Sequence, residues 1–352
     1  MKQYREFEFK LRTLAPVFIG SGETYKQREY IYENDAYYFP NFVTLYRKFS
    51  SNQRQQEAFE NYLMSSRRQE KNMRLGEFLR RINFTDRDLG GYEIKATGAE
   101  VENNGDPDRL NEIAKFIKDP QGRPYIPGTS LKGAIRTILI NTRFKGVEKI
   151  PWGGSDDIFH DIRVSDSEPL KLSSLVITKK WDYNTRKDGP NPLPLTRECL
   201  KPYTKVIFTI TTVGDEAAEI ISGLSKAADE FYKRYEERFL KDLDPKYRQS
   251  GYNHPIYLGG GSGLWTKANY DRINIEQIRS EQIRSHTSGK MKMTGNGVFK
   301  LTKAKRQSYR LKIKGVIEER ELVGKNGGAA DTRDGIGFYE MGKCCFTIKE
   351  KK

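Results

Sequence analysis

The sequence predicts an α+β fold made of two ferredoxin-like domains, residues 1–214 and 215–352, with helical and loop insertions. Three observations support this prediction. Apolar and polar residues alternate in several short runs, a pattern typical of half-buried strands. A strongly amphipathic helix directly follows the clearest strand, residues 206–213. Strand, glycine-rich loop and helix also occur in the same order in both halves, which favours two units of similar topology.

The amino-terminal half opens with a predicted strand in which Phe7, Phe9 and Leu11 alternate with polar residues. Residues 31–39 predict a hairpin, because an Asn-Asp turn divides two tyrosine-rich runs. A helical pattern of apolar residues follows and predicts a helical insertion at about residues 41–90. The remaining predicted elements of this half are a strand at 93–101, a helix at 132–144, strands at 162–165 and 174–178, and a proline-rich loop at 189–195.

The carboxy-terminal half begins with the amphipathic helix, residues 216–240. Its expected core-facing residues recur every three or four positions and are Ala217, Ile220, Leu224, Ala228, Phe231, Tyr235 and Phe239. After the helix come the glycine-rich segment LGGGSGLWTK at 258–267 and a basic tract at 282–317, with a strand expected at 309–317. A glycine-rich strand ends the chain.

Net charge is the property that excludes the most functional classes. The 352 residues contain 62 Lys and Arg against 47 Asp and Glu, and the resulting net charge of +15 is typical of nucleic-acid-binding proteins. Two stretches lack acidic residues, 120–147 and the basic tract. We expect them to form one continuous cationic stripe. The cations of the basic tract are Arg284, Lys290, Lys292, Lys300, Lys303, Lys305, Arg306, Arg310, Lys312 and Lys314.

Other features of the composition exclude several classes of protein. No stretch approaches the roughly eighteen apolar residues of a membrane span, and no amino-terminal targeting pattern is present, so we expect a soluble, cytoplasmic protein. The cysteines Cys199, Cys344 and Cys345 form neither an even disulfide set nor a spaced metal quartet. With only three histidines, a histidine-rich metal site is not expected, and no cofactor is predicted.

The segment YIPGTSLKGAIR, residues 125–136, is the strongest local indication of an anion site. Its glycines let the backbone turn and another chain approach closely, and its hydroxyls are expected to cap the helix that follows. Two cations lie one turn apart on that helix, where the helix dipole adds positive potential. The residues concerned are Thr129, Ser130, Lys132, Gly133 and Arg136. They predict polyanion binding, and an ordinary helix start with solvated cations is the alternative.

The glycine-rich segments and the aromatic residues favour a long, single-stranded ligand. None of these segments fits the phosphate-loop pattern ending in Gly-Lys-Ser/Thr, so nucleotide hydrolysis is disfavoured. Glycines beside cations or hydroxyls at many places favour a ligand touched at many points. Phe299 and Tyr309 offer ring faces for unstacked bases within the basic tract. Trp152 and Trp265 are either further stacking sites or core anchors.

Two other functions stay open on the residues alone. Asp156, Asp157, His160 and Asp161 form a cluster that could ligate a divalent metal, with His286 as a further candidate. Acidic residues at a loop and helix start are also routine caps. The first alternative is therefore a metal-dependent RNA endonuclease that processes precursor or target RNA. The second is a protein adaptor whose basic surface meets acidic partners.

Four blocks of the sequence resemble the RAMP superfamily of CRISPR effector proteins. YIPGTSLKGAIR is similar to that family's Pro-Gly-Ser-Ser-Leu-Lys-Gly helix start, and LAPVFIGSG resembles its first strand and loop. PWGGSDD followed by IRVSDSEP resembles the second block, and GIGFYEMGKCCF resembles the terminal glycine-rich strand. The chain length, LGGGSGLWTK and the helix after FTITT are most similar to the family of fifth subunits in type III-A Csm interference complexes.

The resemblance implies a non-catalytic RNA-binding subunit with two domains like RNA-recognition motifs. Such a subunit caps the 3′ side of the crRNA and supports crRNA maturation and complex assembly in antiviral defence. The implied partners are crRNA, a single-stranded guide, the other Csm subunits, especially those of the backbone, and target RNA as a further candidate. A related backbone subunit cuts RNA with an aspartate after its first strand. Residues 23–33 offer only glutamates there, which favours a non-nuclease.

The expected site residues follow from the resemblance and from charge. The loop and helix residues match the RNA-facing segments of the family, whereas the residues of the basic tract are included on charge alone. No catalytic and no metal-binding residue is expected. The expected RNA-binding residues are Ser21, Thr129, Ser130, Lys132, Gly133, Arg136, Lys290, Lys292, Lys300, Lys303 and Arg306.

Overall fold

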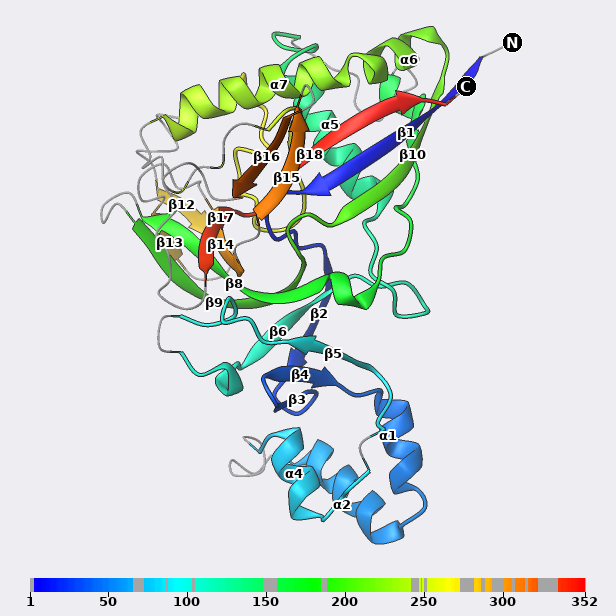
Figure 1. Cartoon of the computed structure of the whole chain (residues 1–352), viewed down its shortest axis with the longest axis vertical. Helices are drawn as coiled ribbons and strands as arrows, with labels where there is room; N and C mark the ends of the chain where they lie inside the picture. The colour runs from blue at the N-terminus through cyan, green and yellow to red at the C-terminus, as the bar shows by residue number, and fades with distance from the viewer. Residues whose placement is uncertain are drawn as a thin grey trace.

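The computed structural model has the predicted α+β architecture, with two large β-sheets and a helical insertion at the end of the molecule opposite α6 and α7 (Figure 1). The structure describes residues 3–65, 73–86, 88–102, 105–147, 157–184, 189–241, 247, 249, 252–272, 282–285, 289–292, 300–305, 308–313, 316–321 and 335–351. No helix within these ranges combines the length and apolar content needed to cross a membrane.

Five antiparallel strands form the first sheet. Their spatial order is β11 (Pro255–Tyr257), β18 (Lys343–Glu350), β1 (Tyr4–Thr13), β10 (Lys205–Val213) and β7 (Ile162–Val164). Alternation along β1 buries Phe7, Phe9 and Leu11, as predicted, and the Phe9 ring stacks on that of Phe346 at 4.6 Å between centroids. Without the β11 edge, the chain order of this unit is strand, helix, strand, strand, helix, strand, which is ferredoxin-like.

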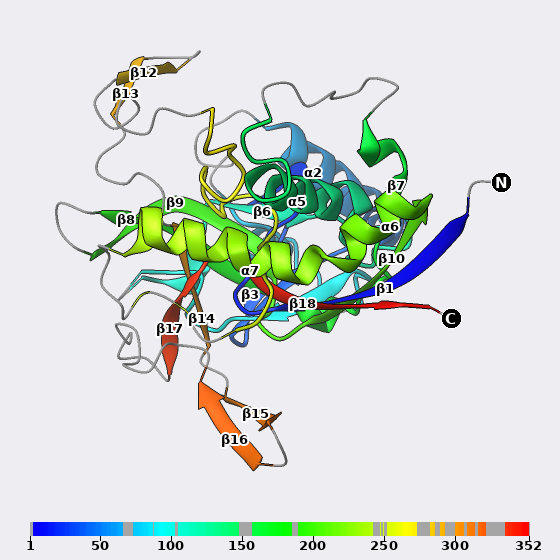
Figure 2. The same ribbon diagram turned by 90° about the horizontal axis from the view of Figure 1, so that it is seen from above.

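Two helical segments complete this unit. α5 (Gly128–Asn141) precedes β7, whereas α6 (Asp215–Ser222) and α7 (Leu224–Tyr235) follow β10 and continue into a π-helical turn, η4 (Glu236–Leu240). The predicted helix at 216–240 is therefore divided at Gly223. All of its predicted core-facing residues are buried. α5 and α7 pack against each other (Figure 2).

The second sheet has six strands and a different connectivity. Its spatial order is β17 (Ile336–Glu340), β14 (Lys300–Lys305), β8 (Leu175–Asn184), β9 (Gly189–Leu200), β6 (Glu112–Phe116) and β2 (Gly20–Lys26). Neighbouring strands are antiparallel except for β6 and β9. The described residues therefore contain one ferredoxin-like unit instead of the two predicted.

The proline-rich segment at 189–195 is a strand, although the sequence predicts a loop. It forms the first part of β9 and pairs antiparallel with β8, so that Pro192 lies opposite Trp181. β6 reaches β9 only beyond the prolines, at Thr196 and Arg197. The proline stretch is thus an edge on that side, and proline is tolerated on an edge because no ladder bond is lost.

Helices lie in the region where the sequence predicts a helical insertion, and they have a core of their own. Its helices are α1 (Phe42–Phe49), α2 (Gln53–Met64) and α4 (Leu75–Arg81). A three-stranded sheet lies beside it in Figure 1, with the order β3 (Ile31–Glu33), β4 (Ala36–Phe39) and β5 (Tyr92–Lys95). The predicted hairpin is β3–β4, and its turn holds Asn34 and Asp35 at φ angles of 51° and 55°. The core of the insertion consists of Leu45, Phe49, Phe59, Tyr62, Leu75, Phe78, Leu79 and Leu89.

Both large sheets combine strands from the two predicted domains. β18 pairs with β1 in the first sheet, and β14 and β17 extend the second sheet beyond β8. A boundary at residue 214 therefore does not assign either sheet to a single domain. The carboxy-terminal strands pair with edge strands of the amino-terminal half. Three short 3-10 helices lie in the connections: η1 (Pro107–Arg109), η2 (Ile158–His160) and η3 (Leu172–Ser174).

The basic tract is divided among three places and does not form the single stripe that charge predicts. The hairpins β12 (Gln282–Ser285) with β13 (Gly289–Lys292) and β15 (Ser308–Ile313) with β16 (Val316–Glu321) lie on opposite sides of the molecule in Figure 2. β14, between them in sequence, belongs to the six-stranded sheet. There Lys303 is only 1% exposed, and its Nζ lies 4.5 Å from the Trp181 ring centroid. Lys303 is a buried cation, so the expectation that it contacts RNA is wrong.

Candidate nucleic-acid interface

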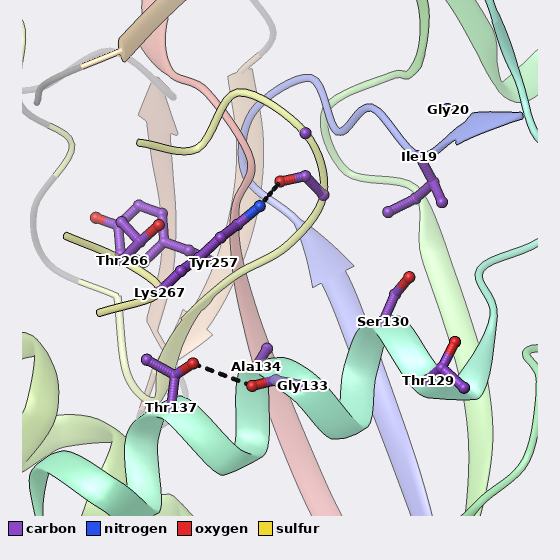
Figure 3. Close-up of a pocket in the computed structure, with 12 residues that line it drawn as sticks. Ile19, Gly20, Thr129, Ser130, Gly133, Ala134, Thr137, Tyr257, Thr266 and Lys267 are labelled. Carbon is purple, nitrogen blue, oxygen red and sulfur yellow. Dashed lines mark hydrogen bonds between the residues drawn. The ribbon is translucent and has the colours of Figure 1, made fainter. Parts of the chain in front are cut away.

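Three segments that are far apart in sequence meet beside the amino-terminal end of α5. They enclose a cavity of about 380 Å³, which we call the α5 groove (Figure 3). One wall is α5 itself, the second is the start of β2, and the third is the glycine-rich segment 258–267 with the end of β11. The lining residues are Ile19, Gly20, Thr129, Ser130, Gly133, Ala134, Thr137, Tyr257, Gly259, Gly260, Thr266 and Lys267. The groove thus joins the two glycine-rich segments that the sequence singled out.

The start of α5 leaves polar groups open to this groove. A Cβ on Gly128 would lie 2.2 Å from the carbonyl oxygen of Val164, so only glycine permits this close packing on β7. The Gly128 amide donates to Asp166 Oδ1 (2.8 Å), and the Ser130 amide donates to the Pro127 carbonyl (2.9 Å). The amide of Thr129 has no partner among the described residues. It lies at the positive end of the helix dipole, where an anion is favoured.

The predicted helix cap is wrong. The residue that caps α5 is Pro127, whose own side chain accepts no hydrogen bond. The carboxylate that accepts from the first turn is that of Asp166, which takes the Gly128 amide. The hydroxyls of Thr129 and Ser130 rise from α5 on its groove side instead (Figure 3). Gly133 follows one turn later, and a Cβ there would meet nothing within 4 Å. The glycine therefore leaves space in the groove without serving the packing of the described chain.

The opposite wall is held in place by the backbone and by one arginine. Gly259 has a φ angle of 78°, and a Cβ there would lie 2.1 Å from the Phe18 carbonyl oxygen. The next amide, that of Gly260, donates to the same carbonyl (2.8 Å). Arg197 of β9 donates to the Gly260 carbonyl (3.1 Å), with its guanidinium carbon 4.7 Å from the Phe18 ring centroid. These contacts fix the glycine segment to the chain that enters β2.

Lys267 is a groove cation that the sequence did not single out. Its ammonium donates to the Gly259 carbonyl (2.6 Å) across the loop (Figure 3). Burial lowers the pKa of Lys267 from its ordinary value. Among the described residues the lining contains this cation and no acidic side chain, which makes the local potential positive. Lys267 could have been found from its position at the end of LGGGSGLWTK, but the larger basic tract concealed that signal.

Tyr257 joins the floor of the groove to a buried polar network. Its hydroxyl donates to Glu340 Oε2 (2.5 Å), and Glu340 also pairs with Lys343 at 3.0 Å. The amide of Gln249 donates to the same carboxylate. Burial raises the pKa of Tyr257 well above its ordinary value, so the phenol stays protonated and keeps donating.

Lys132 and Arg136 lie on another side of α5 and do not line the groove. Lys132 Nζ donates to the Phe159 carbonyl (2.6 Å), and Arg136 Nη2 binds Asp157 Oδ2 (2.7 Å). The guanidinium carbon of Arg136 also lies 4.8 Å from the centroid of the Phe159 ring. Burial, together with the charge of Arg136, lowers the pKa of Lys132. Both cations therefore anchor η2 to α5.

The carboxylate at the centre of the predicted metal cluster is already occupied. Asp157 is buried, and its Oδ1 accepts the amide of Phe159 (3.0 Å) while Oδ2 binds Arg136. Its role is thus the cap that the sequence offered as the alternative. Asp156 and His286 lie outside the described residues. Within the described ranges, no group of three or more His, Cys, Asp or Glu residues is arranged to hold a metal ion.

The other predicted site residues are dispersed. Ser21 is exposed in β2 beside the groove, and its hydroxyl accepts the amide of Glu23 (3.2 Å). Lys290 and Lys292 belong to β13, and Lys300 begins β14. Three of the predicted residues, Thr129, Ser130 and Gly133, line the groove.

The remaining predicted residues fall in different places, and one of them, Tyr309, belongs to β15. Trp265 is buried and stacks on Phe239 at 4.7 Å between centroids, so it is a core anchor. Arg306, Trp152 and Phe299 lie outside the described residues.

Comparisons with known proteins identify the family. A family model described as the RAMP superfamily matches residues 10–264. The CRISPR system Cms protein Csm5 of Streptococcus thermophilus is 42% identical, with 99% of this chain and 98% of that protein covered. The protein of the same description from Mycobacterium tuberculosis (strain CDC 1551 / Oshkosh) is 30% identical, with 75% of this chain and 83% of that protein covered.

A solved structure has the same fold. It is the cryo-EM structure of a Csm–crRNA–target RNA ternary complex in a type III-A CRISPR-Cas system, of which one chain is similar to this one with a TM-score of 0.60. The alignment covers 97% of this chain and 100% of that chain at 17% identity, so this likeness concerns the fold. From the family model and the full-length similarity, the chain belongs to the RAMP superfamily and, within it, to the Csm5 family.

Proposed function

We propose that the chain is a non-catalytic RNA-binding subunit of a type III-A Csm interference complex and that it holds the 3′ side of the crRNA in the α5 groove. Membership of the Csm5 family supports a place in such a complex. The resemblance of the chain length, of LGGGSGLWTK and of the helix after FTITT to the fifth Csm subunits supports the 3′ position. By holding this end of the guide, the subunit would support crRNA maturation and complex assembly, next to the backbone subunits.

The convergence of three distant segments on one groove is the observation that carries the proposal. Among the described residues, the groove offers the unpartnered amide of Thr129, the hydroxyls of Thr129 and Ser130 and the ammonium of Lys267, and no carboxylate lines it. Its three other hydroxyls, those of Thr137, Tyr257 and Thr266, donate to oxygens of the chain itself. These are donors for the oxygens of a ribose-phosphate strand, and they carry no means of distinguishing bases. Sequence recognition is then left to base pairing by the guide. The engagement of Asp157 with Arg136 supports the non-catalytic part of the proposal.

Binding to a single RNA strand gives the first test. Lys267→Glu reverses a charge inside the groove, and Lys226→Glu makes the same change on the exposed surface of α7, outside the groove lining. We expect Lys267→Glu to weaken crRNA binding by about tenfold or more and Lys226→Glu to have a much smaller effect, because like charges in contact repel strongly. Filter binding at fixed salt measures both. Equal losses for the two variants would contradict a groove-specific contact.

Salt dependence and incubation with Mg²⁺ test the rest of the proposal. If cations elsewhere on the chain bring the total to about six phosphate contacts, the affinity should fall on the order of 300-fold between 50 and 200 mM salt. Labelled precursor RNA incubated with the chain and Mg²⁺ should stay intact. Cleavage that Asp157→Asn abolishes would instead establish the endonuclease alternative.

A further inference from the structure

The helical insertion has a second cavity, far from the α5 groove in sequence. It lies between α2 and α4 and measures about 180 Å³, and we call it the α2–α4 groove. Four lining residues are apolar: Ala58, Met73, Phe78 and Ile82. The volume is below the roughly 300 Å³ at which small-molecule pockets begin, so it suits one protein side chain.

Two polar groups of this groove, a cation and an amide, have no partner among the described residues, whereas the Tyr62 hydroxyl donates to the Met73 carbonyl (3.1 Å). Arg81, the last residue of α4, is exposed and makes no hydrogen bond or ion pair with any described residue. The amide of Asn61 on α2 is likewise exposed and unpaired within the described chain. Two other cations of this region are engaged: Lys48 binds Asp86 and Arg74 binds Asp108. No acidic residue lines the groove within the part of the chain that the structure describes.

We propose that the α2–α4 groove is a docking site for a segment of another protein subunit that carries an apolar side chain next to a carboxylate. The apolar side chain would fill the cavity, as anchor residues do in protein interfaces. The carboxylate would pair with Arg81, whose planar fork matches carboxylate geometry, and would accept from Asn61. Charge complementarity thus selects an acidic partner.

The aromatic rings of the groove favour protein over RNA. Tyr62 and Phe78 stack on each other with centroids 4.2 Å apart and planes at 14°, so the faces turned toward each other offer no platform for a base. The Tyr62 ring also lies 5.0 Å from the guanidinium carbon of Arg28. One cation beside an apolar floor is a poor track for a polyphosphate backbone, which needs several.

The test uses the chain assembled with crRNA and the other subunits of its complex. Photo-activation of an Asn61→benzoylphenylalanine variant, followed by peptide mass spectrometry, identifies the neighbour. We expect a peptide of another protein subunit with Asp or Glu within a few residues of Leu, Ile, Met or Phe. Cross-links to RNA, to a second copy of this chain, or to nothing in an assembled complex would each overturn the proposal.

Charge variants separate docking from general electrostatics. In the Asn61→benzoylphenylalanine background, Arg81→Glu should lower the cross-link yield by about tenfold, whereas Arg81→Lys should retain most of it. Arg54→Glu is the matched control, because Arg54 is exposed on α2 and does not line the groove. Equal losses from Arg81→Glu and Arg54→Glu would overturn the specific site. RNA binding by the isolated chain should be unchanged in the Arg81→Glu, Arg81→Lys and Arg54→Glu variants. The cross-linking result therefore tests the α2–α4 groove independently of the α5 groove.

Discussion

The two sides of helix α5 carry opposite kinds of surface. Toward the groove it presents small neutral residues, Thr129, Ser130 and Gly133, with an open amide and space above the backbone. On another side it carries the cations Lys132 and Arg136, both bound to the connection around η2. A cation that already contacts a carboxylate adds little net potential for a ligand, whereas an unpaired donor in a concave site adds much. The comparison shows that open donors locate the candidate site better than the count of charges does.

Two glycines of α5 give the largest expected contrast. Gly128→Ala should destabilise the fold by about 3 kcal/mol, because the new methyl group would overlap backbone atoms of Val164 and Ser165. Gly133→Ala should instead stabilise it by about 0.5 to 1 kcal/mol, since alanine is the better helix former and the space is open.

Urea denaturation of both glycine variants measures this difference directly. The same Gly133→Ala variant should bind RNA more weakly, because its methyl group occupies the groove. A destabilisation of similar size in the two variants would contradict the assignment of one glycine to packing and the other to the ligand.

Arg136 gives the next largest effect, and it concerns stability. Removing one partner of a fully buried ion pair costs about 3 to 5 kcal/mol. The Arg136 side chain is 35% exposed, so solvent screening reduces the expected loss for Arg136→Ala to about 2 kcal/mol. Arg143→Ala is the control, because the Arg143–Glu219 pair is exposed and should contribute less than about 0.5 kcal/mol. Thermal unfolding measures the stability of both variants. If Arg136→Ala folds but loses RNA affinity, Arg136 contacts RNA, and our assignment of it to stability alone is wrong.

The lysines on the two sides of α5 predict a smaller effect, on salt dependence. Lys267→Ala should make the slope of log affinity against log salt shallower by about 0.7, the value for one lost single-strand phosphate contact. Lys132→Ala should leave the slope unchanged, because that ammonium is bound to the Phe159 carbonyl outside the groove. Filter-binding titrations of both variants measure the two slopes. A shallower slope for Lys132→Ala than for Lys267→Ala would show that RNA binds on the other side of α5.

The pH dependence of RNA binding is the smallest expected effect. Burial lowers the pKa of Lys267 below 10.5, so this side chain loses its charge at a lower pH than an ordinary lysine. Only the protonated ammonium attracts phosphate, and RNA affinity should therefore begin to fall between neutral pH and 10.5. Lys267→Arg should reduce this alkaline loss, because a guanidinium stays protonated there. An identical pH profile for the two proteins would argue against a role for Lys267.

Local patterns predicted the elements well. Alternation located β1, the spacing of apolar residues located α6 and α7, and an Asn-Asp turn located the β3–β4 hairpin. These signals are local, since a strand or helix must bury one face of its own. Sheet topology depends on pairing between distant segments. The residues of β14 and β18 do not indicate which strands these two will pair with. For that reason the sequence could not establish the second ferredoxin-like unit or the boundary at residue 214, and both stay predictions.

The candidate site could be predicted only in part. Helix-start chemistry identified Thr129, Ser130 and Gly133, because a glycine-rich turn before a helix leaves donors open. Charge did not distinguish Lys267 from Lys303, since burial and ion pairing are decided by tertiary contacts. Lys303 is enclosed by aromatic rings, whereas Lys267 lies across the groove. A basic composition therefore predicted the type of partner and not the residues that meet it.

Cross-linking of guide RNA in the assembled complex tests the central claim most directly. Photo-reactive uridines would be placed at successive positions of the crRNA, and the cross-linked peptides of this chain would be identified by mass spectrometry. We predict that uridines near the 3′ end attach to peptides containing residues 128–137 or 258–267. Attachment of those uridines only to the β12–β13 hairpin or to the segment around η2, with none in the groove, would contradict the account.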